Sequence, residues 1–177
     1  RTIAAAASAP DSYSQSTGRL CLMRHFFSLS ADVNDGTDVV VVPDNVAVGE
    51  KGANFIITQL GENGGDVAII EGKAGNASGE SRKTGATNAF KKADKIKLVA
   101  SQPADWDRQK ALDTATSYIQ MYPNLKAIYC CNDTMALGAL QAVINADKLG
   151  KIIVVGTDGS AEALESIRAG QLDATVA

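Results

Sequence analysis

The feature that most constrains the fold is a regular alternation of strand-like and helix-like segments, which runs from Asp44 to the end of the 177-residue chain. The apolar strand centres near Ile69, Val99, Tyr129 and Val154 lie about 30 residues apart, the length of one strand-helix-strand unit. Strands joined by helices in this way run parallel, and the helices cover the sheet. The alternation therefore predicts an α/β fold with a doubly wound parallel sheet and helices on both faces.

The expected elements follow from apolar periodicity and from glycine, proline and capping signals. We expect helices at 45–61, 78–93, 105–122, 133–146 and 160–170, and strands at 66–72, 96–102, 126–132, 151–158 and 172–177. The apolar residues that fall near one stripe of the first helix are Val48, Phe55, Ile56 and Leu60. Gly61 is placed to end this helix, and Ser78 is a candidate N-cap of the next one.

The first part of the chain differs in character from the rest. Residues 1–38 hold "SYSQST", the basic-aromatic "RHFF" and "DVNDGTD" without a sustained helical or alternating period, so we assign them no fold. The run "VVVV" at 39–42 is consistent with a short buried strand, ended by Pro43. We therefore divide the chain into an atypical leading segment, 1–42, and a regular domain, 43–177.

Composition excludes several functional classes. A net charge of -3 and a pI of about 5.1 leave no basic face for a nucleic acid, and no apolar run approaches the roughly 20 residues of a membrane span. A single histidine, His25, and three cysteines argue against a metal site or a histidine relay. The glycines at 72, 75 and 79 lack the spacing of either phosphate-binding motif. We expect no metal, no cofactor and no enzymatic activity.

Two adjacent cysteines, Cys130 and Cys131, precede an Asn-Asp pair. Neighbouring cysteines form a disulfide with each other only in strained geometry, and buried strand residues are their commoner role. We expect them to complete a strand with one side chain toward each face of the sheet.

The residues of interest follow the strands, because ligands of such sheets bind outside the carboxyl ends of the strands. Arg82 either reaches back over the strand ends, where its planar guanidinium can donate to hydroxyls or an oxyanion, or is a solvated helix residue. Trp106, between Asp105 and Asp107, could stack on a ring, while one of these aspartates caps the next helix.

Two further strand ends carry a polar candidate. For "CCNDT" we favour a ligand role for Asn132 and a capping role for Asp133. In "VVGTDGS", Asp158 is either an acceptor for two hydroxyls or a residue of a cap or Asx-turn. One arginine, one aromatic, one amide and one carboxylate suit a neutral, polyhydroxylated ring, and they require no nucleophile or metal.

The stretches "DNVAVGEKGANFI", "GGDVAIIEGKAGNASGESRKTGATNAFKKA", "KLVASQPADWDRQKALD", "KAIYCCNDTMALGALQAV" and "VVGTDG" resemble the periplasmic sugar-binding proteins of the ribose-binding type, which are type I periplasmic binding proteins of bacterial ABC transporters. The resemblance covers residues 44–177. It implies that Arg82, Trp106, Asn132 and Asp158 are sugar-binding residues. It also implies two lobes that close around one monosaccharide of the D-allose or D-ribose class.

On this resemblance, residues 43–177 correspond to the C-terminal lobe, truncated at its end, and residues 1–42 are a remnant of, or a replacement for, the N-terminal lobe. The family's next sugar contact, a Gln, would follow "ATVA". The implied setting is the periplasm, with a monomer as the oligomeric state and a membrane permease as the partner. We expect a sugar to bind weakly or not at all to this chain, because half a site leaves the hydroxyls hydrated.

The alternative is the ligand-binding core of a sugar-responsive transcription regulator of the Lac repressor type. That class would need a helix-turn-helix segment upstream, and residues 1–40 offer no capped helix pair with a basic face.

Overall fold

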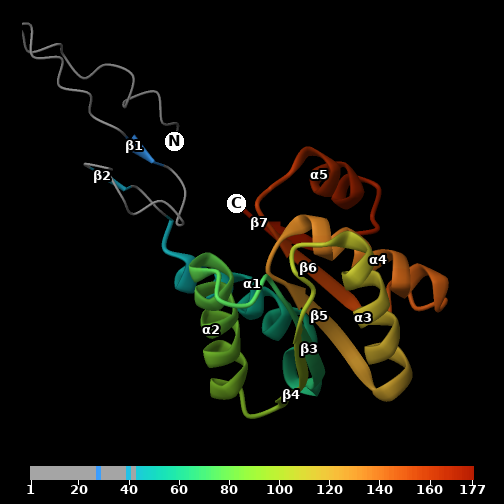
Figure 1. Ribbon diagram of the computed structural model, residues 1–177. Helices are drawn as coiled ribbons and strands as arrows, with labels where there is room; N and C mark the ends of the chain where they lie inside the picture. The colour runs from blue at the N-terminus through green and yellow to red at the C-terminus, as the bar shows by residue number, and fades with distance from the viewer. Residues whose placement is uncertain (1–26, 29–38, 41–42) are drawn as a thin grey trace, which may run out of the picture.

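The computed structural model describes residues 27–28, 39–40 and 43–177 (Figure 1). Strands β1 (Phe27–Ser28) and β2 (Val39–Val40) pair in parallel. The strand expected at 39–42 is therefore present at its first two residues, while its remainder, and the side chains of all four valines, lie outside the description. Cys21 and His25 lie outside it as well.

From Asn45 onward the predicted alternation is confirmed. The helices are α1 (Asn45–Leu60), α2 (Ala77–Lys92), α3 (Arg108–Met121), α4 (Asp133–Asn145) and α5 (Ala161–Arg168), with a short 3-10 turn η2 (Gly61–Asn63). The strands are β3 (Gly65–Glu71), β4 (Ile96–Pro103), β5 (Leu125–Cys130), β6 (Ile153–Thr157) and β7 (Ala174–Val176). None of the helices in this described part combines the length and hydropathy needed to cross a bilayer.

The five strands β3 to β7 form one parallel sheet in the order β4-β3-β5-β6-β7. The chain passes from β3 outward to β4 and then returns across β3 to β5 (Figure 1). The direction of winding therefore reverses between β3 and β5. In an open α/β sheet the carboxyl ends of the strands at such a reversal border the ligand crevice.

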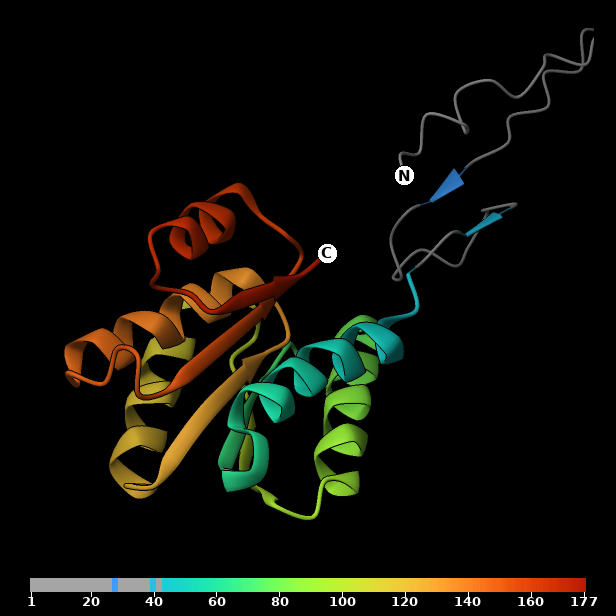
Figure 2. The ribbon, with the colours of Figure 1, turned by 180° about the vertical axis from the view of Figure 1, so that it is seen from behind.

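Helices cover both faces of this sheet, as predicted. Helices α1 and α2 pack together on one face, and α3 and α4 pack together on the other (Figures 1 and 2). Helix α5 lies beside β7, near the end of the chain. The strand centres, including Ile69, Ile128 and Val154, are buried between the two helical layers.

The α1–α2 contact depends on small residues rather than on the predicted apolar stripe. Ile56 is fully buried, but Val48, Phe55 and Leu60 are only partly buried. A Cβ atom added to Gly49 would lie 2.0 Å from the Arg82 carbonyl oxygen, and one added to Gly85 would lie 2.0 Å from the Val46 carbonyl oxygen. The two backbones approach so closely that these positions admit only glycine.

Two predicted helix starts are corrected. Helix α2 is capped by Asn76 and not by Ser78, since the Asn76 side chain accepts a hydrogen bond from the Gly79 amide at 3.0 Å. Helix α3 begins at Arg108 rather than at 105, because Asp105 and Trp106 have φ angles of 53° and 64°. Asp107 is the aspartate that caps α3, with its carboxylate 2.7 Å from the Lys110 amide. The predicted C-cap, Gly61, is confirmed.

Candidate functional site

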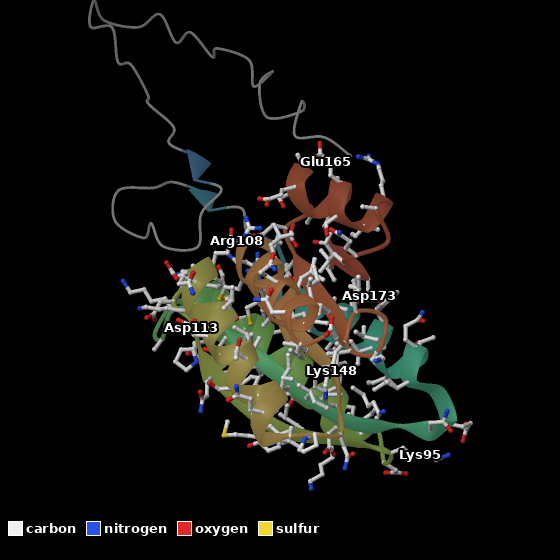
Figure 3. All side chains as sticks on the ribbon, turned by 90° about the vertical axis from the view of Figure 1, so that its right-hand side faces the viewer. Lys95, Arg108, Asp113, Lys148, Glu165 and Asp173 are labelled. Carbon is white, nitrogen blue, oxygen red and sulfur yellow. The ribbon has the colours of Figure 1, made fainter. Side chains whose placement is uncertain are left out.

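The carboxyl ends of the strands form one edge of the molecule. Figure 3 shows Arg108, shortly after β4, at the end of α3 nearest α5, and Lys95, just before β4, at the opposite end of the domain. Trp106, Asn132 and Asp158 lie within three residues of the ends of β4, β5 and β6, and Arg82 lies in the helix that follows β3. The topology therefore brings all four predicted residues to the carboxyl edge.

Arg82 is the most firmly held of the four. Its Nε donates to Asn45 Oδ1 at 2.9 Å, and its Nη1 donates to the Cys131 carbonyl oxygen and to Asp158 Oδ1, both at 2.8 Å. The side chain is 14% exposed, so these contacts are shielded from water. Within the described residues Nη2 has no hydrogen-bond partner. These bonds orient the guanidinium through Nε and Nη1, and Nη2 keeps its donors for a ligand.

Asp158 faces Arg82 from the end of β6. Its backbone has a φ of 119°, rare for a residue with a side chain, and its amide donates to the Val176 carbonyl oxygen at 2.9 Å. Partial burial raises the pKa of the Asp158 carboxyl, and the guanidinium of Arg82 offsets part of that rise. The carboxylate is 45% exposed and can accept hydrogen bonds from outside while it remains paired.

The predicted capping role of Asp133 is wrong, while the predicted ligand role of Asn132 stays a prediction. Asn132 is the N-cap of α4, with Oδ1 accepting from the Met135 amide at 2.9 Å. This cap engages only the oxygen of the side chain. No hydrogen bond from Nδ2 occurs in the part of the chain that the structure describes, so the amide group keeps two donors at the carboxyl edge.

Asp133 instead joins three elements from a buried position. Its carboxylate accepts from the Ser160 amide at 2.7 Å and from the Thr175 hydroxyl at 2.6 Å. The same Thr175 oxygen accepts from the Gly159 amide at 3.1 Å. These bonds tie the start of α4 to β7 and to the loop that carries Asp158. They hold the unusual backbone of Asp158 in place.

Trp106 projects from the β4–α3 loop and is half-buried. Its six-membered ring packs against Gly72, directly after β3, and against Gly79 in the first turn of α2. The sequence placed this side chain at the mouth of a helix rather than in its core stripe, and that prediction is confirmed.

The two cysteines do not form a disulfide. Cys130 ends β5 and Cys131 follows it, and both are buried free thiols. Burial raises the pKa of Cys130 well above its usual value and that of Cys131 to about 12. Cys131 contributes to the site through its backbone carbonyl, which accepts from Arg82.

The described residues contain no group of three or more His, Cys, Asp or Glu side chains that could hold a metal ion. A separate depression between α4 and α5 includes none of the four predicted residues. Its lining residues are Arg108, Leu137, Leu140, Gln141, Ile144, Glu162, Glu165, Ser166, Ala169 and Gln171.

The carboxyl edge thus combines donors on Arg82 and Asn132, an acceptor on Asp158 and an aromatic surface on Trp106. Sequence reasoning missed Asn45, assigned Asp133 to a helix cap, and did not connect Gly72 and Gly79 with the indole. Asn45 carries no signal in the sequence, since its partner Arg82 is 37 residues away. The glycines at 72 and 79 are visible in the sequence, but the sequence does not show that the Trp106 ring packs against them.

Comparison with known proteins places this geometry in a family. The periplasmic binding protein domain model matches residues 25–177. The match begins inside the leading segment, so the boundary between residues 42 and 43 stays a prediction.

Individual relatives are similar over a shorter range. The chain is 69% identical over 140 residues to the D-allose-binding periplasmic protein of Escherichia coli K12, which covers 79% of this chain and 45% of that protein. It is 40% identical over 140 residues to the ribose import binding protein of Bacillus subtilis, covering 79% and 44%. The chain thus spans about half the length of these curated relatives.

A solved structure supports the same assignment. The ABC transporter periplasmic solute-binding protein of Actinobacillus succinogenes 130z, with bound D-allose, superposes with a TM-score of 0.73 at 41% identity, over 75% of this chain and 46% of that one. Because the domain model extends over most of the sequence and the sheet has the same fold, this chain belongs to the periplasmic binding protein domain family.

Proposed function

We propose that this chain provides the sugar-recognition lobe of the solute-binding component of an ABC-type monosaccharide importer. The observation that carries the proposal is the Arg82–Asp158 pair, held beside Asn132 and Trp106 at the carboxyl edge of the sheet. A neutral sugar offers hydroxyls that both donate and accept, and an apolar C–H face that stacks on an aromatic ring. The proposed ligand is a monosaccharide of the D-allose or D-ribose class.

Each residue has a role in this proposal. Arg82 Nη2 and Asn132 Nδ2 donate to ring hydroxyls, Asp158 accepts from them, and the indole of Trp106 covers the apolar face. The lobe binds without catalysis and without a cofactor. The proposed setting is the periplasm, where a monomeric binding protein delivers the sugar to a membrane permease. The relatives reported above are import and periplasmic binding proteins, which favours this role over that of a transcription regulator.

Saturation-transfer NMR with millimolar D-allose or D-ribose tests the proposal on the chain itself. We expect transfer to the sugar protons, strongest on the face that stacks on Trp106. Transfer should be lost in Arg82→Ala and Asp158→Ala and retained in Thr84→Ala, an exposed neighbour on α2. Equal transfer in all four proteins would contradict the proposal.

A chimera extends the test to a complete site. Residues 43–177 replace the corresponding half of the E. coli D-allose-binding protein, which the 69% identity makes feasible. The chimera should bind D-allose, and Trp106→Ala, Arg82→Ala, Asn132→Ala or Asp158→Ala should each weaken binding at least tenfold. A folded chimera that does not bind the sugar would argue against the proposed ligand class.

A further inference from the structure

The six-membered ring of Trp106 packs against the backbone of two glycines. A Cβ atom added to Gly72 would lie 2.1, 2.2 and 2.6 Å from the indole atoms Cη2, Cζ2 and Cζ3. A point in the ring plane cannot be that close to three consecutive ring carbons, so Gly72 lies against the face of the six-membered ring. The buried backbone of Gly72 therefore lies against one face of the six-membered ring.

Gly79 bounds the same ring at its edge. A Cβ atom added there would lie 2.9 and 3.0 Å from Cζ2 and Cη2, and the next nearest atom is the Gly72 Cα at 3.5 Å. The Gly79 backbone is itself held, because its amide donates to Asn76 and its carbonyl accepts from the Cys131 thiol at 3.9 Å. We call Gly72 and Gly79 the indole seat.

The indole seat is linked to Arg82 through helix α2. Gly79 and Arg82 are three residues apart in α2 and so share one face of the helix. The loop that carries Trp106 is fixed to the same strand end, with the Ala104 amide donating to the Glu71 carbonyl oxygen at 3.0 Å. One helix therefore carries both the edge of the indole seat and the guanidinium.

We propose that Gly72 and Gly79 are positioning residues that set the depth of the Trp106 ring relative to Arg82, and so determine the thickness of the sugar ring that fits. This inference rests on the proposed function for its ligand. A side chain at either position pushes the indole outward, into the volume assigned to the sugar. Neither glycine touches the ligand.

Gly79→Ala tests the indole seat, because its expected effect on Tm is opposite to that of an ordinary Gly→Ala substitution in a helix. Alanine is a better helix former than glycine, so the change should raise Tm where the space is empty. In the native chain the indole occupies the space, and we expect Tm to fall. Trp106 is the only tryptophan, and its emission should shift to longer wavelength as the ring moves toward solvent.

The double variant Gly79→Ala/Trp106→Phe shows whether Gly79 is needed because of the indole or because of helix packing in general. Phenylalanine at 106 does not reach the positions of Cζ2 and Cη2, so Gly79→Ala should raise Tm in a Trp106→Phe background. Gly85→Ala, in the same helix but facing α1, serves as the control. It should lower Tm in both backgrounds, because the added methyl group meets the Val46 carbonyl oxygen and not the indole. If Gly79→Ala changed Tm in the same direction in both backgrounds, the proposed role of the indole seat would be wrong.

Sugar titration separates this inference from the proposed function. Gly79→Ala should weaken D-allose or D-ribose binding at least tenfold, as measured by saturation transfer, whereas Thr84→Ala should not. Reversal of the Tm effect, together with a folded chimera that does not bind the sugar, would support the indole seat and reject the proposed function. Unchanged binding in Gly79→Ala would reject the positioning role while the proposed function stands.

Discussion

At the residue scale, two arginines in ion pairs differ sharply in what surrounds them. Arg82 is mostly buried and satisfies Asn45, the Cys131 carbonyl and Asp158. Arg108 is 51% exposed, and its partner Glu162 is 60% exposed. Buried polar groups that lose a partner destabilise a protein far more than exposed pairs do.

Arg82→Ala should therefore lower the free energy of unfolding by about 2–3 kcal/mol, since it leaves the buried Asn45 amide and a backbone carbonyl without a donor. Arg108→Ala is the matched control, with an expected change of about 0–1 kcal/mol. Urea unfolding followed by circular dichroism measures both. Similar losses for the two variants would show that Arg82 is not anchored as described.

Asn132 combines a cap with a proposed ligand contact, and two substitutions separate these roles. Asn132→Ala removes the cap of α4 and should cost about 1 kcal/mol of stability. Serine caps helices about as well as asparagine, so Asn132→Ser should stay within about 0.5 kcal/mol of the native chain. Both changes remove the Nδ2 donors and should abolish sugar binding in saturation-transfer NMR. Retained binding in Asn132→Ser would remove the ligand role.

At the element scale, the close approach of α1 and α2 depends on glycine. Gly85→Ala places a methyl group where the Val46 carbonyl oxygen lies, so the helices must separate. Overpacking of this kind costs about 1–3 kcal/mol, against a gain in helix propensity of about 1 kcal/mol.

We therefore expect a net loss of stability of up to about 2 kcal/mol in thermal or urea unfolding. The neighbouring exposed position is the control, and Thr84→Ala should change stability by less than about 0.5 kcal/mol. A Gly85→Ala chain as stable as Thr84→Ala would refute the close α1–α2 contact.

Strand β5 and the residue after it bury both vicinal thiols. Their raised pKa values keep them protonated near neutral pH, and the thiol is far less reactive than the thiolate. Iodoacetamide at pH 8 should modify neither Cys130 nor Cys131 in the folded chain, and both in urea, as read by peptide mass mapping. Modification of either cysteine before unfolding would contradict their burial.

At the scale of the whole molecule, the described residues offer one wall of the proposed binding site. Asp158 is partly exposed and Trp106 is half-buried, so a sugar on this edge keeps part of its hydration. Association must also offset the loss of translational and rotational freedom. The 177-residue chain should bind D-allose and D-ribose more weakly than micromolar by isothermal titration, and the chimera should bind more tightly. Submicromolar affinity of the chain alone would contradict this prediction.

The amino-acid sequence by itself determined the fold class, the order of the elements and the edge of the sheet at which to look. These follow from local periodicity and from strand-end positions, which neighbouring residues encode. The sequence was less reliable at helix starts, where Asn76 rather than Ser78, and Asn132 rather than Asp133, form the caps. Asparagine, serine and aspartate cap helices almost equally well, so composition does not choose among adjacent candidates.

Only the tertiary structure decided which groups meet. Arg82 pairs with Asp158 across 76 residues of chain, and its other partners come from α1 and from the Cys131 backbone. Trp106 packs against two glycines, and their lack of a side chain makes room for the indole only once the strands are aligned. Such contacts depend on strand order and on how closely helices approach, and both are set by packing of the whole sheet rather than by any local pattern.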